Sequence, residues 1–214
     1  MNEALSGGGL FLLRTILSLA SFLFLLRFLL QAVRADFYNP LTQGVVRFTD
    51  PLLKPLRTLI PYLGGLDIAA LGLTLIAEIL LCMLTFGLPL GSAILVAAFR
   101  LPMRLLELYF WALLIVVILS WVAPMSRHPG AELLEQLTGP VLAPIRRLLP
   151  PAGGLDFSVL VLFLLLTLLR DYLVPGLALE VGIPRMLLPS GRGLVPCEGP
   201  RALARLRAHS GRGS

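Results

Sequence analysis

Of the charged side chains within the apolar stretches of this 214-residue chain, two lie deep enough that an ionised group is costly. Glu78 follows Asp67 by 11 residues, which places it about 16 Å along a helix and near the middle of a bilayer. Arg27 is the available opposite charge, in the preceding apolar stretch. The sequence predicts that Glu78 faces the interior of a helix bundle, either protonated or paired, with Arg27 as the partner. The alternative function for these intramembrane charges is an ion or proton pathway.

Two aspartates, Asp67 and Asp156, each follow a Gly-Gly-Leu sequence and precede an apolar stretch. A carboxylate in that position accepts hydrogen bonds from the free N–H groups of the first helical turn and meets the positive end of the helix dipole. We therefore predict that both aspartates cap helices. The alternative is a paired cation site at the axis that relates two halves of the chain.

The remaining reactive groups lack the spacing of known catalytic or metal sites. The motifs H-E-x-x-H, C-x-x-C, G-x-S-x-G and the P-loop are absent from the sequence. His128 and His209 have no second His or Cys near them, and Cys82 is explained as a small apolar residue of a span. A haem or metal ligand is the alternative for His128. We expect no enzymatic activity, no cofactor and no metal.

Membrane-spanning helices are the elements that must position these residues. Hydrophobic residues make up 57% of the chain and charged residues only 14%, about half the charged share of a soluble domain. A soluble fold of this size cannot bury so much apolar surface. The net charge of +6 is compatible with nucleic acid, but basic residues that flank spans and contact anionic headgroups explain it better. We predict an all-α integral membrane protein that binds no nucleic acid.

Four stretches, residues 10–32, 66–86, 101–122 and 155–174, approach or exceed the length needed to cross a bilayer, about 20 residues. Residues 88–99 are apolar but would cover only about 18 Å as a helix. We predict a short linker helix at 87–98, interfacial or re-entrant; the alternative is a fifth, tilted span. In the third span, Arg104 and Glu107 can pair on one face, and Trp121 is a predicted interfacial anchor.

The chain repeats itself at an offset of 89 residues. From residue 39 to 67, 12 of 29 positions are identical to those from 128 to 156, including Pro, Gly, Arg and Asp positions that a bias toward Leu cannot explain. We predict two tandem repeats, residues 10–86 and 99–174, each a span, a connector and a second span. With two spans in each, the repeats share one orientation, whereas a fifth crossing would invert one of them.

The two connectors carry apolar residues at spacings of three and four, the period of an amphipathic helix. We predict that these helices lie in the membrane interface with their basic residues among the headgroups. Those residues include Arg57 in the first repeat and Arg146 and Arg147 in the second. The basic tail, residues 175–214, is predicted to be mostly disordered, in contact with lipid or docked on a partner.

Several of these segments together resemble the YggT (YlmG) family of small bacterial and plastid membrane proteins. They are D-F-Y-N-P from Asp36, then P-L-L-K-P-L-R and G-G-L-D, and in the second repeat L-S-W, P-V-L-A-P-I-R-R-L-L-P-P and G-G-L-D-F-S. Proteobacterial members carry the unit twice. The first repeat departs from the pattern at Thr58 and Ala32, where the second has Arg147 and Trp121. The resemblance implies no settled activity, because relatives are linked to cytochrome assembly, to cell division or nucleoid organisation, and to osmotic or potassium tolerance.

These observations favour a non-enzymatic assembly or organising factor of a bacterial inner (cytoplasmic) membrane, in cytochrome maturation, cell division or envelope stress. The alternative is a small potassium-type ion or osmolyte channel or transporter used under osmotic stress. The expected partners are anionic lipid headgroups and a membrane protein or a second copy of the chain. Because the connectors carry most of the basic residues, we expect them in the cytoplasm and both termini in the periplasm.

Overall fold

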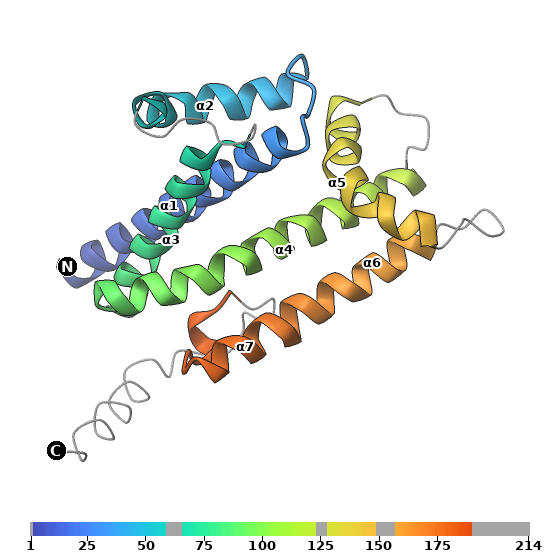
Figure 1. Ribbon diagram of the computed structural model, residues 1–214. Helices are drawn as coiled ribbons and strands as arrows, with labels where there is room; N and C mark the ends of the chain where they lie inside the picture. The colour runs from blue at the N-terminus through green and yellow to red at the C-terminus, as the bar shows by residue number, and fades with distance from the viewer. Residues whose placement is uncertain (1, 59–65, 123–127, 149–156, 190–214) are drawn as a thin grey trace.

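The computed structural model describes residues 2–58, 66–122, 128–148 and 157–189, and every regular element in these ranges is a helix. Within them, four runs are long and apolar enough to cross a membrane, which confirms the predicted all-α fold with four spans. The fourth run is continuous through α6, the π-helical turn η1 and α7 (Figure 1). The spanning elements are α1 (Asn2–Ala32), α3 (Ile68–Phe86), α4 (Leu90–Val122), α6 (Phe157–Leu168), η1 (Leu169–Leu173) and α7 (Val174–Glu180).

The connectors of the two repeats are the helices α2 (Pro40–Arg57) and α5 (Pro129–Leu148). Each begins with a proline, whose missing N–H is no loss at the first helical position. Asn39 Oδ1 accepts a hydrogen bond from the N–H of Leu41 at 2.9 Å, and His128 Nδ1 accepts one from the N–H of Gly130 at 3.1 Å. Equivalent positions of the repeats therefore cap their connector helices in the same way.

The repeats also build their cores from equivalent positions. In the first repeat, Phe24 of α1 packs with Leu53 of α2 and with Ala70 and Leu73 of α3. Adding the offset of 89 gives Leu113, Leu142, Val159 and Leu162, which pack together in the second repeat. In both cases the first span, the connector and the second span meet in one cluster, so the repeat seen in the sequence is a repeat of packing.

Residues 87–98 differ from the prediction, because they do not form a separate linker helix. The chain breaks where expected, at Gly87, which closes α3 in a left-handed conformation with φ 63°. From Leu90, however, one helix of 33 residues runs to Val122 without interruption at Pro102. Arg100 and Arg104 divide the apolar run in the sequence, but α4 continues through both.

The first part of the predicted tail, residues 175–189, is packed against the bundle, which the sequence did not indicate. The fourth span continues to Glu180, and the short 3₁₀ helix η2 (Arg185–Leu187) follows. Ala178, Ile183 and Leu187 are buried in a cluster with Cys82 and Met103, on α3 and α4. These apolar residues hold residues 175–189 against the bundle; residues 190–214, the rest of the predicted tail, lie outside the described residues.

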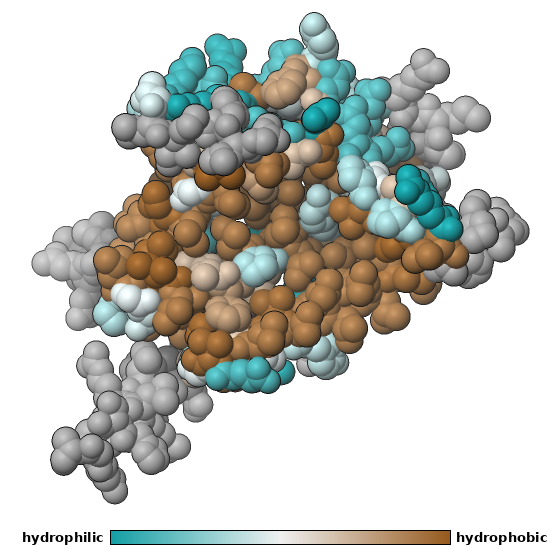
Figure 2. All heavy atoms as spheres, in the orientation of Figure 1, coloured by the Kyte–Doolittle hydropathy of each residue, from teal (hydrophilic) through white to brown (hydrophobic). Residues whose placement is uncertain are grey.

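The connectors share one side of the molecule. Figure 1 places α2 at the top of the view and α5 at the upper right, and Figure 2 shows hydrophilic residues gathered in both places beside a broad hydrophobic surface. Asn39 Nδ2 donates a hydrogen bond to the carbonyl of Pro129 at 2.7 Å, and the N–H of Asp36 donates one to Gln136 Oε1 at 2.9 Å. These bonds join the start of α2 to the first half of α5 and place the two connectors side by side.

Candidate functional site: a buried charge cluster beside an inter-repeat cavity

Glu78 lies in α3 with none of its surface exposed. Its Oε2 accepts a hydrogen bond from Arg100 Nε at 2.8 Å. Its Oε1 accepts one from Ser21 Oγ at 2.8 Å and one from Arg104 Nε at 3.2 Å. The carboxylate therefore faces the bundle interior and is paired, as predicted, and both of its oxygens are engaged by protein groups.

The prediction that Arg27 pairs with Glu78 is wrong. Arg27 Nη2 lies 3.4 Å from Asp50 Oδ1 on the connector α2. Arg27 follows Ser21 by six residues along α1, a rise of about 9 Å toward the connectors, so its guanidinium reaches α2 instead of the middle of α3. The charges that Glu78 meets come from α4, at the start of the second repeat.

The charge cluster, defined as Glu78, Arg100, Arg104 and Glu107, was only partly evident in the sequence. The predicted pair of Arg104 and Glu107 is confirmed, with Nη1 and Oε2 3.4 Å apart. The spacing of Arg100, Arg104 and Glu107 places them on one face of a single helix. The spacing becomes informative only because residues 90–122 form one continuous helix.

Arg100 also binds the C-terminal part of the chain. Its Nη1 donates a hydrogen bond to the carbonyl of Leu187 at 2.8 Å, while its Nε holds Glu78. One buried guanidinium thus connects α3, α4 and η2. Arg14, nearer the N-terminal end of α1, donates from Nη2 to the carbonyl of Leu84 on α3 at 2.8 Å.

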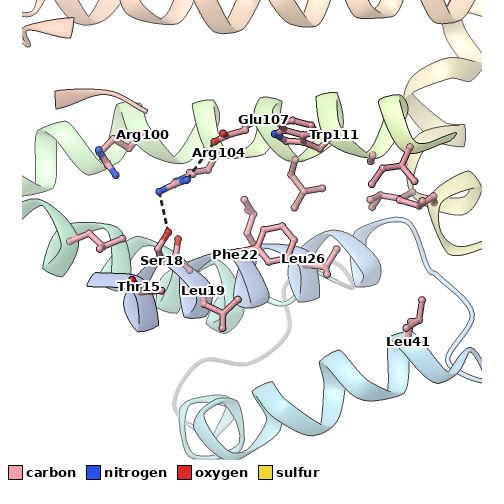
Figure 3. A pocket seen from close by; sticks show the side chains of 18 of the residues that line it. Thr15, Ser18, Leu19, Phe22, Leu26, Leu41, Arg100, Arg104, Glu107 and Trp111 are labelled. Carbon is pink, nitrogen blue, oxygen red and sulfur yellow. Dashed lines mark hydrogen bonds and ion pairs between the residues drawn. The ribbon is translucent and has the colours of Figure 1, made fainter. Parts of the chain in front are cut away.

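A cavity of about 1090 Å³ lies between the first spans of the two repeats, α1 and α4; we call it the inter-repeat cavity. Figure 3 shows Arg100, Arg104 and Glu107 of α4 near Thr15 and Ser18 of α1 at one end of the cavity. Arg104 Nη2 is 3.5 Å from Ser18 Oγ across the gap.

Farther along, the cavity walls are apolar. Phe22 and Leu26 of α1 lie opposite Trp111 of α4 in Figure 3. The far end is formed by Leu41 at the start of α2 and by leucines of α5. The cavity therefore has one charged end and one apolar end.

Asp67, the first of the two predicted helix caps, belongs to a second group of charged residues, which lies on the connector side. Asp67 is buried, and its Oδ1 accepts a hydrogen bond from the N–H of Ala70 at 3.2 Å, which makes it the N-cap of α3. Its Oδ2 accepts a hydrogen bond from Arg57 Nη2. Arg57 Nη1 lies 3.8 Å from Asp50 Oδ1. The second predicted cap, Asp156, lies outside the described residues.

The predicted residues of the second repeat do not join either group. Arg146 and Arg147 are exposed near the end of α5, and Trp121 is exposed near the end of α4. Deeper in this repeat, Arg170 Nε lies 2.9 Å from Asp171 Oδ1, and the Arg170 guanidinium is 4.6 Å from the centre of the Phe110 ring. The second repeat therefore has an intramembrane charge pair of its own.

Among the described residues, no three His, Cys, Asp or Glu side chains lie together in a way that could hold a metal ion. His128 uses Nδ1 to cap α5. His209 and Cys197 lie outside the described residues.

The sequence of the chain matches the family model described as CCB3/YggT twice, over residues 7–88 and 95–177. An uncharacterized protein of Pseudomonas aeruginosa is 44% identical over 190 residues, covering 86% of this chain and 96% of that protein. The uncharacterized protein YggT of Escherichia coli K12 is 38% identical over 188 residues, covering 87% of this chain and 94% of that protein. No solved structure matches the chain.

Proposed function

The chain belongs to the CCB3/YggT family, and from that premise we propose that it is a non-enzymatic factor that assembles or organises other components of the bacterial cytoplasmic membrane. The observation that carries the proposal is the surface formed by α2 and α5, which we call the connector surface. The bonds of Asn39 and Asp36 join the start of α2 to the first half of α5. The two helices thus offer one continuous surface on one side of the membrane.

The connector surface has the residues of an interfacial docking site. On α2, Val45 and Leu53 are buried against the bundle while Arg47 and Lys54 are exposed. Large apolar side chains are exposed beside the basic ones, among them Phe48 at 77%. Amphipathic helices of this kind bind anionic headgroups through their basic residues and insert apolar residues among the lipids. The proposed partners are therefore anionic lipid and a membrane protein or a second copy of the chain.

Cytoplasmic connectors are part of this proposal. Arg47, Lys54 and Arg147 are exposed on the connector side. Arg100 and Arg104 belong to the span α4 and bind Glu78, so they do not count as basic residues of a loop on the other side. The asymmetry of basic residues that sets orientation is thus larger than the sequence alone indicated.

Thiol labelling tests this orientation. In a chain whose native cysteines are replaced by alanine, we expect Phe48→Cys to react with a membrane-impermeant reagent only when the cytoplasmic face is accessible. Leu90 is also exposed and begins α4 at the end of that helix away from the connectors. Leu90→Cys should therefore react only when the reagent reaches the periplasmic face. The reverse pattern would overturn the orientation.

Ion or osmolyte transport is the second candidate function, and the charge cluster gives it little support. A cation that used Glu78 would have to displace Arg100 and Arg104 from its carboxylate. We expect reconstituted protein to give no potassium flux above that of empty liposomes, for the wild type and for Glu78→Gln alike. Flux that Glu78→Gln abolishes would establish transport and contradict the organising role.

Photo-crosslinking in living cells tests the organising role directly. A photoreactive residue at Phe48 or Leu148 probes the connector surface, and one at Leu164 probes an exposed position of the span α6 as the matched control. We expect discrete protein adducts from the connector positions and only diffuse products from Leu164. Absence of any adduct specific to the connector positions would contradict the proposal.

A further inference from the structure

We propose that the inter-repeat cavity binds one phospholipid with a net negative headgroup. The phosphate lies at the charged end and an acyl chain follows the apolar walls toward α5. This inference does not rest on the proposed function, because it concerns the inter-repeat cavity between α1 and α4, to which the connector helices contribute only the apolar far end.

The size and position of the cavity fit a lipid. Its volume of about 1090 Å³ is at or above the upper end of the range for small-molecule pockets, roughly 300–1,000 Å³. Three wall residues, Leu19, Phe22 and Trp111, are each about half exposed, so the cavity opens sideways at the surface of the spans. In a membrane that opening faces acyl chains, and a lipid can enter without leaving the bilayer.

The polarity of the cavity fits an amphiphile. Hydroxyl and charged groups gather at one end, where Thr15 and Ser18 lie near Arg104 (Figure 3). The opposite end is made by Leu41 and by Leu133, Leu134 and Leu137 of α5. A hydrated ion would find no ligands along most of this space, and a wholly apolar molecule would leave the charged end unmatched.

The charge at the polar end fits an anion. Arg14, Arg100 and Arg104 supply three positive charges, and Glu78 and Glu107 supply two negative ones, which leaves an excess of one positive charge. A phosphodiester carries one negative charge and accepts hydrogen bonds from guanidinium groups. The headgroup of a zwitterionic lipid would add a cation beside the arginines, so a lipid with a net negative headgroup is favoured.

Unused hydrogen-bond donors point the same way. Arg14 Nε is buried and has no hydrogen-bond partner. Arg104 reaches Glu107 and Ser18 only at 3.4 and 3.5 Å, and its side chain stays 28% exposed. Arg14 is bonded to Leu84, two residues before the end of α3, so the charged end lies toward the membrane face opposite the connectors. A headgroup from that leaflet can reach it.

Tryptophan fluorescence tests the site, because the chain has only two tryptophans and one lines the cavity. The full chain with Trp121→Phe leaves Trp111 as the reporter, and Trp111→Phe leaves Trp121 to report bulk lipid. Each is reconstituted in phosphatidylcholine with a minor fraction of lipid that carries brominated acyl chains, which quench nearby tryptophan. We compare brominated phosphatidylglycerol, phosphatidylcholine and free fatty acid.

We expect brominated phosphatidylglycerol to quench Trp111 as if enriched roughly fivefold over phosphatidylcholine, the factor that about 1 kcal/mol per basic residue gives. Trp121 should show no such preference. Arg14→Gln should remove the preference, while Arg14→Lys keeps it and Arg170→Gln, a charge outside the cavity, leaves it unchanged.

Equal quenching of Trp111 by the two phospholipids would overturn the proposal. This comparison uses only the protein with the Trp111 reporter, so it stays decisive even if Arg14→Gln fails to fold. Preference for the brominated fatty acid with none for phosphatidylglycerol would also overturn it, because the ligand would then be a free carboxylate. A phosphatidylglycerol preference that Arg14→Gln leaves intact would contradict the assigned headgroup position.

Discussion

The two repeats agree in their apolar cores and disagree in their deep polar residues. Thr49 and Thr138 are equivalent, and each donates its hydroxyl to the carbonyl four residues earlier. Glu78, by contrast, corresponds to Thr167, whose hydroxyl simply donates to the carbonyl of Phe163. Ser21, which binds Glu78, corresponds to Phe110, which lies under Arg170. The scaffold has been kept in both copies, whereas the chemistry inside the membrane has diverged.

This divergence joins the repeats to each other. Glu78 of the first repeat is held by Arg100 and Arg104, whose equivalents in the first repeat are Phe11 and Thr15. A single repeat therefore contains the carboxylate but not its cations. We infer that this buried cluster fixes which helices meet more than it adds net stability, since a buried ion pair must offset the cost of desolvating its charges.

We expect the largest difference between the two repeats when the side chain of Glu78 is removed. Glu78→Ala leaves two guanidinium groups buried without their carboxylate, and we expect it to lower the free energy of unfolding by about 3–5 kcal/mol. Thr167→Ala, at the equivalent position, removes only a bond within its own helix turn and should cost less than about 1 kcal/mol. Denaturant titration of both variants in detergent measures the difference; similar losses would mean that the charge cluster has no special structural role.

The second test concerns the shared core. Leu53 and Leu142 are equivalent and nearly or fully buried, so we expect Leu53→Ala and Leu142→Ala each to cost at least about 2 kcal/mol. The two losses should agree within about 1 kcal/mol if the cores are truly equivalent. The same titrations provide the measurement. A loss of stability in only one of the two variants would show that the two cores are not equivalent.

The sequence predicts the features of this fold that neighbouring residues determine, and it does not predict contacts that depend on how distant residues pack. Spans, caps and the break at Gly87 follow from neighbouring residues, and the offset of 89 residues predicts the matching cores. The partner of Glu78 does not follow, because Arg100 lies 22 residues farther along the chain and reaches Glu78 only through the packing of α3 against α4. The repeat gives no guidance there, since the residue equivalent to Glu78 in the second copy is the uncharged Thr167.

A third test separates the capping role of Asp67 from a cation site. Asp67→Ala removes the bond to the N–H of Ala70 and the contact with Arg57, so we expect a loss of about 1–2 kcal/mol. Asp67→Asn keeps a capping oxygen and should cost a few tenths to about 1 kcal/mol. We expect the same two losses at Asp156. Membrane abundance measured beside any growth phenotype decides, because an abundant but inactive Asp67→Asn protein would favour a cation site.

The smallest expected effect compares the caps of the connectors. Asn39 is buried and also bonds Pro129, so Asn39→Ala should cost about 1 kcal/mol. His128 is exposed, so His128→Ala should cost about 0.5 kcal/mol. Hydrogen exchange at the first turns of α2 and α5 reports each cap separately. Faster exchange in both helices after Asn39→Ala alone would show that the junction of the connectors stabilises them together.

The pairing of Glu78 with α4 has a consequence for the order in which the chain enters the membrane. Arg100 follows Glu78 by 22 residues, so at about 5–20 residues per second the ribosome needs roughly one to four seconds to supply it. During that interval α3 carries a carboxylate without its cation, which the bilayer disfavours. Only residues 87–89 separate α3 from α4. We therefore expect α3 and α4 to leave the translocon as a hairpin, with the first repeat completing its insertion only after the second has begun.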